Sequence, residues 1–327
     1  MLMRLITAAA VLALTTGAAT AQIDLNEKLT LTGFIDMSLV NNDNTTEMGL
    51  DQIELDFIVD LGEGLSMRAD FEGTSPVWST AFSHNSIDHG HDHGSTTVLE
   101  QAFISYDVGE GLSLVMGKYL SVSGWETAEP TGLYQHSTSA TLVYGGYQHG
   151  VGVSYKTDKY GLFGSVVSSV WDGNDTSFEQ PGFETQLTLT PVEQVTAKVA
   201  YLYEDFGDYN TGLVNGWVAY FAGSLTLAGE VNLLSNWKLD GRNGLGLLTM
   251  ANYRLSDKIG ITGRFSSLDL DSVEDKGDVI AKEEKTSEFT ISPSYSVTDN
   301  WSIIAEAKFI SNGSSTTQLA RESLLSF

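Results

Sequence analysis

From residue 28 onward, apolar and polar residues alternate in segments of about ten residues, separated by turn-forming residues. In one segment, Ile53, Leu55 and Phe57 alternate with Glu54 and Asp56. A period of two is typical of a β-strand, because successive side chains point to opposite faces of the sheet. A tilted strand of about ten residues spans the apolar layer of a membrane, whereas strands of soluble sheets have about five or six. The pattern therefore predicts a membrane β-barrel and not a soluble β-sandwich.

The connections between these segments alternate between short turns and long loops, as in bacterial membrane barrels. The short turns are Gly62–Gly64, Gly109–Gly111, Asp158–Tyr160, Val192–Gln194, Ala222–Ser224, Ser256–Lys258 and Thr298–Asn300. The long loops are Asn41–Met48, Gly73–Thr96, Val122–Gln148, Asp172–Gly182, Asp205–Leu213, Asn236–Gly244, Asp269–Thr286 and Asn312–Thr316. Seven turns and eight loops predict an all-β fold, a transmembrane antiparallel barrel of about sixteen strands with a water-filled lumen. The division of Asn215–Ser235 stays ambiguous, and Pro293 falls inside a predicted strand.

The N-terminal segment predicts export. A short positive start ends at Arg4, an apolar run follows from Leu5 to Leu14, and Ala19 to Ala21 form a small-x-small cleavage site. This is the pattern of a secretory signal peptide, and the apolar run is too short for a membrane helix. We therefore expect a signal peptide at residues 1–21, cleaved after Ala21, and a single barrel domain at residues 22–327.

The C-terminal segment predicts how the barrel closes. Phe327 ends the chain, and Leu325 and Leu319 lie on the same side of an extended strand. A closed barrel pairs its last strand with its first, which leaves no open edge in lipid. This ending resembles the last strand of outer-membrane barrels of Gram-negative bacteria, whose final Phe is read by the barrel-assembly machinery. The resemblance implies that Phe327 takes part in barrel closure.

Composition excludes several function classes. The chain has 42 Asp and Glu against 17 Lys and Arg, and its net charge is -25. A nucleic-acid partner is not expected, because binding a phosphate backbone requires a basic face. The chain lacks a G-x-S-x-G element, and its Ser, His and Asn residues lie in predicted loops without a convergent arrangement, so we do not expect an enzyme.

The loop Val122–Gln148 is long for a connection in a compact barrel, and it follows the fifth predicted strand. The chain reads GKYLSVSGWETAEPTGLYQHSTS from Gly117 and HGVGVSYKTDKYGLFGSVVSSVWDGND from His149. These segments resemble the second family of β-barrel porins, in which a G-K-aromatic strand leads into a loop with G-aromatic-E and E-P. The resemblance implies an outer-membrane porin for passive diffusion of small hydrophilic solutes. General porins further suggest that residues 122–148 fold inward and that the protein is a homotrimer.

The predicted inward loop carries two acids, Glu126 and Glu129, which are candidate members of a pore constriction. Alternation places six basic residues on the lumen side of the wall: Arg68, Lys156, Lys198, Arg254, Arg264 and Lys308. An acidic loop opposite a basic wall creates a transverse field that orders permeating ions and disfavours bulky apolar solutes. The alternative is that these residues are simply hydrated, since the interior of a porin is polar in any case.

Acidic outer loops such as Asp269–Thr286 predict weak cation selectivity. A negative potential at the outer mouth concentrates cations, and salt screens it over a Debye length of about 8 Å. The same loops could hold Ca²⁺ or Mg²⁺ between lipopolysaccharide phosphates, although they contain no twelve-position calcium pattern.

One long loop suggests a rival function. Within the segment 84–93, two aspartates are interleaved with four histidines: His84, His89, His91 and His93. Imidazole and carboxylate ligands suit zinc, copper or nickel. The chain could therefore be a metal-capturing surface protein, or the loop could bind a divalent metal loosely and without purpose. A non-conducting structural barrel is a further alternative, and no resident cofactor is expected.

Arg321 is predicted to point outward near the middle of the last strand. A lipid-facing Arg at the bilayer midplane costs roughly 2–4 kcal/mol. A subunit interface or a shifted strand register would shelter it.

Overall fold

The computed structural model describes residues 22–42, 45–73, 97–127, 129–141, 143, 145–275 and 278–327. The predicted signal peptide at residues 1–21 and the histidine-rich segment 84–93 lie outside the described residues, so both stay predictions.

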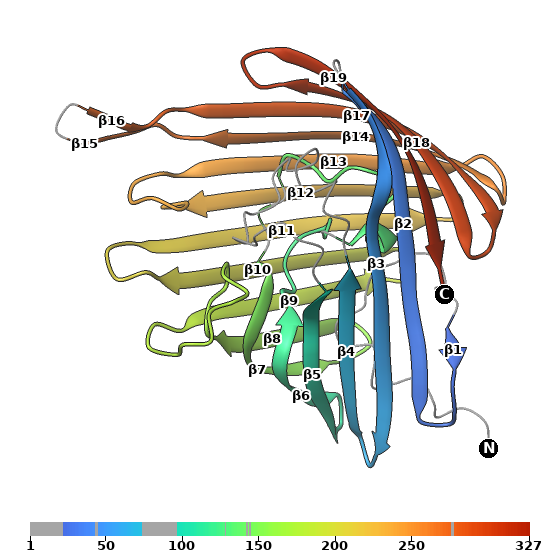
Figure 1. Cartoon of the computed structure of the whole chain (residues 1–327). Coiled ribbons are helices and arrows are strands. Elements are labelled where there is room, and N and C mark those ends of the chain that lie inside the picture. The colour runs from blue at the N-terminus through green and yellow to red at the C-terminus, as the bar shows by residue number, and fades with distance from the viewer. Residues whose placement is uncertain are drawn as a thin grey trace.

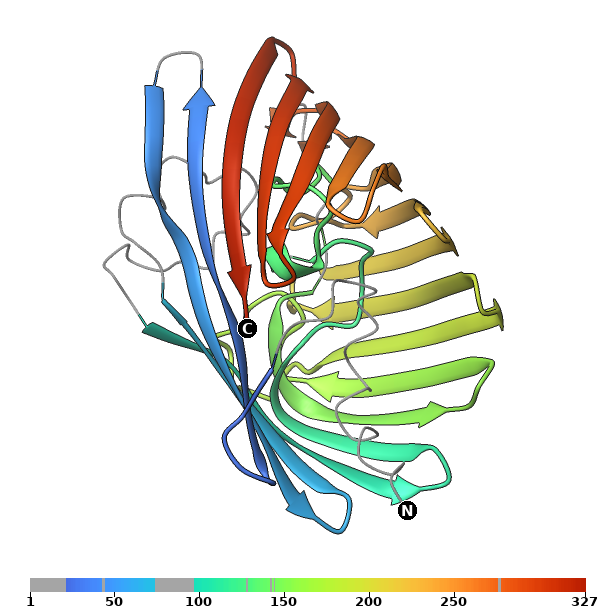
Figure 2. The ribbon, with the colours of Figure 1, turned by 90° about the vertical axis from the view of Figure 1, so that its right-hand side faces the viewer.

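Sixteen long strands form one closed antiparallel barrel (Figures 1 and 2). They are β2 (Leu29–Asn42), β3 (Thr45–Gly62), β4 (Leu65–Gly73), β5 (Thr97–Gly109), β6 (Leu112–Leu120), β7 (Tyr147–Lys156), β8 (Tyr160–Val167), β9 (Gly182–Val192), β10 (Val195–Asp205), β11 (Asn210–Ala222), β12 (Leu225–Ser235), β13 (Gly244–Arg254), β14 (Ile259–Leu270), β17 (Glu284–Thr298), β18 (Trp301–Ser311) and β19 (Ser315–Ser326). Each strand pairs with its neighbour in the chain, and β19 pairs with β2, which closes the ring. The predicted fold class and strand number are confirmed.

Three short strands lie outside this ring. β1 (Ile23–Asp24) pairs with the start of β2, and β15 (Val273–Asp275) forms a hairpin with β16 (Asp278–Ala281) in the loop between β14 and β17. A 3₁₀ turn, η2 (Pro130–Gly132), lies between β6 and β7. Among the described residues, no helix is both long and apolar enough to cross a membrane.

Alternation along each strand separates the two faces of the wall. In β11, for example, Val214 and Val218 are exposed on the outer face, whereas Asn215 and Trp217 between them are buried on the inner face. The outer face is apolar because it meets lipid, and the inner face is largely polar because it meets the lumen and the segment inside it. The short turns need backbone conformations with positive φ, which explains the Gly-Glu-Gly sequence from Gly62 to Gly64.

Two loops are shorter than the sequence predicts. The predicted loop Asn41–Met48 is mostly strand, because β2 and β3 stay paired up to Asn42 and Thr45. The predicted loop Asp205–Leu213 shortens in the same way, since β11 already begins at Asn210. Outside the apolar layer a strand can be polar on both faces, so the alternation signal fades before the pairing ends. In contrast, Pro293 is accommodated inside β17, opposite Ile261 of β14.

Barrel closure extends to the last residue of the chain. The Phe327 amide donates a hydrogen bond to the Gly33 carbonyl oxygen at 2.9 Å, and the Gly33 amide donates to the Phe327 oxygen at 2.8 Å. A Cβ on Gly33 would overlap the Glu54 carbonyl oxygen and lie 3.2 Å from the Phe327 ring. Gly33 therefore lets β2 approach both β3 and the C-terminus closely.

We expect Gly33→Ala to lower the temperature at which the folded band disappears on a heat-modifiability gel. Forcing a methyl group into this contact should cost about 1–3 kcal/mol, the usual cost of overpacking. Gly164→Ala is the matched control, because a Cβ at that mid-strand glycine meets no atom within 4 Å. Equal shifts for the two variants would show that Gly33 is not a special contact.

Candidate functional site

The chain between β6 and β7 folds into the barrel; we call residues 121–146 the inward segment (Figure 2). The Gly124 amide donates to Asn215 Oδ1 of β11 at 3.0 Å, and the Ser137 amide donates to Glu306 Oε2 of β18 at 3.1 Å. Both partners lie on walls distant from β6 and β7 in the ring. The inward segment therefore crosses the lumen and rests on the far wall.

A buried ion pair anchors the inward segment to β14. Arg264 Nη1 lies 3.0 Å from Glu126 Oε1 and 3.1 Å from Oε2, and both side chains are buried. Glu126 also accepts hydrogen bonds from the Gln135 side chain at 2.7 Å and the Ser139 amide at 2.9 Å. A desolvated pair is favourable only when hydrogen bonds satisfy its remaining atoms, and here several do so.

Two further contacts strengthen the anchor. Lys308 Nζ of β18 lies 3.0 Å from Glu288 Oε1 and 3.2 Å from the Thr138 carbonyl oxygen. The Trp125 ring stacks on Tyr134, with ring centroids 6.3 Å apart, and meets the Trp217 ring of β11 edge-on at 5.3 Å. Electrostatic and aromatic contacts therefore both hold the inward segment to the wall.

A cavity of about 390 Å³ lies between the inward segment and the wall. Its charged lining consists of three acids and three bases: Glu54, Asp56, Glu129, Arg68, Lys156 and Lys198. This volume falls within the range of small-molecule sites, about 300–1,000 Å³. Because its lining contains both acids and bases, a solute in this cavity can meet fixed charges of both signs.

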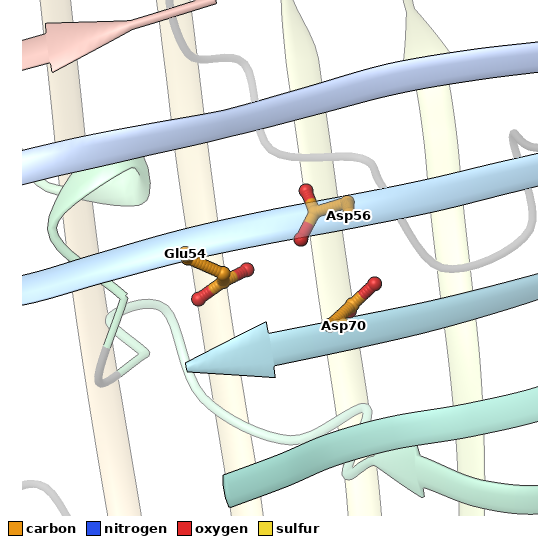
Figure 3. A group of neighbouring side chains, drawn as sticks. All are labelled: Glu54, Asp56 and Asp70. Carbon is orange, nitrogen blue, oxygen red and sulfur yellow. The ribbon is translucent and has the colours of Figure 1, made fainter. Parts of the chain in front are cut away.

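Three carboxylates gather on β3 and β4 at one side of this cavity. Figure 3 shows Glu54 and Asp56 on β3 facing Asp70 on β4, and one oxygen of each lies within 4.8 Å of the others. Arg68 pairs with two of them, at 3.3 Å to Asp56 and 2.7 Å to Asp70. Carboxylate oxygens are ligands for hard cations such as Ca²⁺. In this cluster the guanidinium of Arg68 already supplies positive charge to Asp56 and Asp70.

Residues proposed from the sequence for the constriction fall into three places. Arg68, Lys156, Lys198 and Glu129 line the cavity, whereas Glu126, Arg264 and Lys308 form the anchor behind it. Arg254 is the last residue of β13, and its side chain donates to the carbonyl oxygen of Gly223, in the turn between β11 and β12, at 2.7 Å. The four histidines, His84, His89, His91 and His93, lie outside the described residues.

Sequence reasoning did not single out Glu54, Asp56 and Trp217, which also line the cavity. Alternation already placed both acids on the polar face of their strand, so a search for clustered lumen acids would have found them. Trp217 lies in the stretch whose strands could not be divided from the pattern. Its inward direction follows only once β11 is placed at Asn210–Ala222.

A family model described as "Putative beta-barrel porin-2, OmpL-like" matches residues 16–323. No curated protein sequence matches. Among solved structures, OmpF of Salmonella typhi in complex with daunomycin is similar, with a TM-score of 0.67 and 12% identity over 94% of this chain and 100% of that chain. OprB of Pseudomonas putida reaches 0.66 with 10% identity, over 92% and 94% of the two chains. The trimer form of OmpT from Vibrio cholerae reaches 0.62 with 9% identity, over 91% and 99%.

We expect Arg264→Met to lower the free energy of unfolding by about 3–5 kcal/mol, because it leaves Glu126 buried without its cation. The double variant Arg264→Met/Glu126→Leu should recover part of this loss, since no uncompensated charge remains. Thermal unfolding in detergent, followed by circular dichroism, measures both changes. A double variant no more stable than the single one would show that the two charges are not coupled.

Proposed function

The chain belongs to the family described as putative beta-barrel porin-2, OmpL-like, and from this premise we propose that it is an outer-membrane channel for passive diffusion of small hydrophilic solutes. The observation that carries this proposal is the cavity between the inward segment and the wall, which is lined by charges of both signs. Fixed charges in a narrow lumen select solutes by charge and polarity.

We further propose that the channel is weakly cation-selective. The charges that line the cavity balance, with three acids and three bases, so the wider charge distribution decides the sign. The chain as a whole carries a net charge of -25. The loop around the β15–β16 hairpin carries the acids Asp271 and Glu274, whereas Glu283 and Glu284 beside it are paired with Lys285 and Arg242. This charge would concentrate cations near the loop end of the lumen, and salt would screen it.

Glu129 makes this selectivity dependent on pH. It lies on the inward segment, outside the spanning strands, and burial raises its pKa to about 7, with nearby Asp56 and Asp70 acting in the same direction against Arg68. Glu129 is therefore charged above pH 7 and neutral below it. Acidification removes one negative charge from the cavity and shifts its balance toward anions.

We expect planar-bilayer recordings to show channel steps. In a salt gradient, the reversal potential should indicate weak cation selectivity at pH 8, and this selectivity should decrease as the pH falls through 7. Glu129→Gln should shift wild-type selectivity toward anions at pH 8 and should abolish this pH-dependent step. Glu193→Gln is the matched control, because Glu193 is exposed at the turn between β9 and β10. Absence of channel steps would favour a structural barrel or metal capture over the channel.

We also propose that the protein forms a homotrimer through the outer face around Arg321. Arg321 is exposed at the middle of β19, between Leu39 of β2 and Ala305 of β18, and β18–β19 pairing continues through it without a shift. A shifted register therefore does not hide this charge from lipid. Sheltering it against a second copy would remove a cost of roughly 2–4 kcal/mol, and the OmpT structure described as a trimer form is consistent with this assembly.

We expect the detergent-solubilised protein to have the mass of a trimer by light scattering, and Arg321→Ala to lower the trimer fraction. Lys118→Ala is the control, because Lys118 also lies outside the lumen, near the loop end of β6, where it donates to the Leu99 carbonyl oxygen at 3.1 Å. A monomeric wild type, or an unchanged trimer fraction in Arg321→Ala, would contradict this assembly.

A further inference from the structure

The carboxylates on β3 and β4 form opposed pairs of like charge. Glu54 lies directly opposite Glu72, and Asp56 lies directly opposite Asp70. Like charges that face each other across a pair of strands destabilise a sheet. In the part of the chain that the structure describes, all ion pairs to these four acids come from Arg68, at 3.3 Å to Asp56 and 2.7 Å to Asp70. The four acids therefore carry more negative charge than their protein partner balances.

Arg68 flanks this cluster on one side only. It lies opposite Ile58, which follows Asp56 by two residues along β3, whereas Glu54 precedes Asp56 by two residues. Side chains on the same face of a strand are about 6.4–6.8 Å apart along its length. The guanidinium therefore binds the aspartate pair from the Ile58 side and leaves the Glu54 side without an ion-paired cation among the described residues.

Three of these acids converge on a common centre. Figure 3 shows the side chains of Glu54 and Asp56 turned toward each other along β3, with Asp70 beside them on β4. Each offers one oxygen atom, and the three atoms lie within 4.8 Å of one another. A point therefore exists within about 2.8 Å (4.8 Å divided by √3) of all three, close to the Ca²⁺–oxygen distance of about 2.3–2.6 Å. Mg²⁺ needs about 2.0–2.1 Å in octahedral geometry, so the spacing suits the larger ion.

Asp56 keeps one oxygen atom without a partner in this cluster. The residue is 7% exposed, and its Oδ2 atom accepts a hydrogen bond from Thr32 at 2.8 Å and pairs with Arg68. Its buried Oδ1 atom has no hydrogen-bond donor among the described residues. The Glu54 carboxylate lies within hydrogen-bonding reach of the Asp56 carboxylate. Two carboxylates this close repel each other unless a proton or a cation lies between them.

The lumen supplies the route and the remaining ligands. Glu54 and Asp56 line the cavity, whereas Asp70 is fully buried behind them. A cation can therefore reach the three oxygen atoms from the cavity. Ca²⁺ takes six to eight oxygen ligands, and water from the lumen can complete a set that begins with three carboxylates. Ligands that are all oxygen suit a hard cation better than zinc or copper.

We propose that Glu54, Asp56 and Asp70 bind one Ca²⁺ ion on the lumen wall, with Arg68 on the far side of the aspartate pair. The ion adds two positive charges to a cavity lining in which three acids otherwise balance three bases. Bound Ca²⁺ therefore shifts the lumen toward anions. This consequence rests on the proposed channel function, whereas binding of the ion does not.

The first test is calorimetric titration of the purified full-length protein with CaCl₂ and with MgCl₂. The protein is in detergent, free of lipopolysaccharide and stripped with EGTA, and about 0.15 M KCl screens weak binding to exposed acids. We expect one saturable Ca²⁺ site with a Kd of about 10⁻⁴–10⁻³ M, the range of extracellular calcium modules. Mg²⁺ should bind at least about tenfold more weakly, because the site is too wide for it. Absence of saturable Ca²⁺ binding, or equal affinity for Mg²⁺, would overturn the proposal.

The second test removes two of the ligands. The double variant Glu54→Gln/Asp56→Asn should weaken Ca²⁺ binding by about tenfold or more. The matched control is Glu193→Gln/Asp257→Asn, which removes the same number of negative charges at two exposed turns and should bind Ca²⁺ like the wild type. A heat-modifiability gel shows that both variants are folded. Equal affinity in the two double variants would overturn the proposal.

The third test separates the site from the channel. In bilayers, exchanging EGTA for Ca²⁺ should shift the reversal potential of the wild type toward anions, and it should shift the Glu54→Gln/Asp56→Asn channel less. Equal shifts would show that the ion acts outside the lumen wall and would overturn the proposal. Absence of channel steps would overturn the channel function, and the calorimetric titration would then decide the Ca²⁺ site by itself.

Discussion

Every structural feature of this protein depends on one requirement: within a bilayer, each backbone N–H and C=O group must find its partner inside the protein. The ring of sixteen strands meets this requirement by pairing β19 with β2. The constraint reaches the final residue, because Phe327 exchanges two backbone hydrogen bonds with Gly33. A closed wall whose side chains largely alternate between two faces then leaves the inner face available for function.

The inner face is specialised by the segment that crosses it. Residues 121–146 divide the wall residues into those that hold the segment and those that meet solutes. Glu126 and Arg264 neutralise each other out of contact with the cavity, so their charges serve stability and position. Arg68 and Lys198, which are also basic residues on the inner face, line the cavity instead. Basic residues on the same inner face of the wall therefore differ in their surroundings, because the inward segment covers Arg264 and leaves Arg68 and Lys198 at the cavity.

The remaining charges explain how a strongly acidic protein can have a nearly balanced channel. Acids cluster at Glu54, Asp56 and Asp70, where Arg68 compensates part of their charge. Lysines lie toward the other side of the same cavity. Acids and lysines on different sides of the lumen create a transverse field across it.

Sequence alone determined the barrel, its strand number and the polar face of many strands, because a period of two and the spacing of turns are local properties of the chain. It also indicated that residues 122–148 fold inward, through their length and their resemblance to a porin family. Only the tertiary structure decided which acid of that loop is neutralised and which remains in the lumen. Glu126 and Glu129 are three residues apart and equally acidic, but the partners that separate them, Arg264 and the β3–β4 carboxylates, come from strands far away in sequence. Local pattern carries no information about such pairings, since they depend on where the closed ring places each wall.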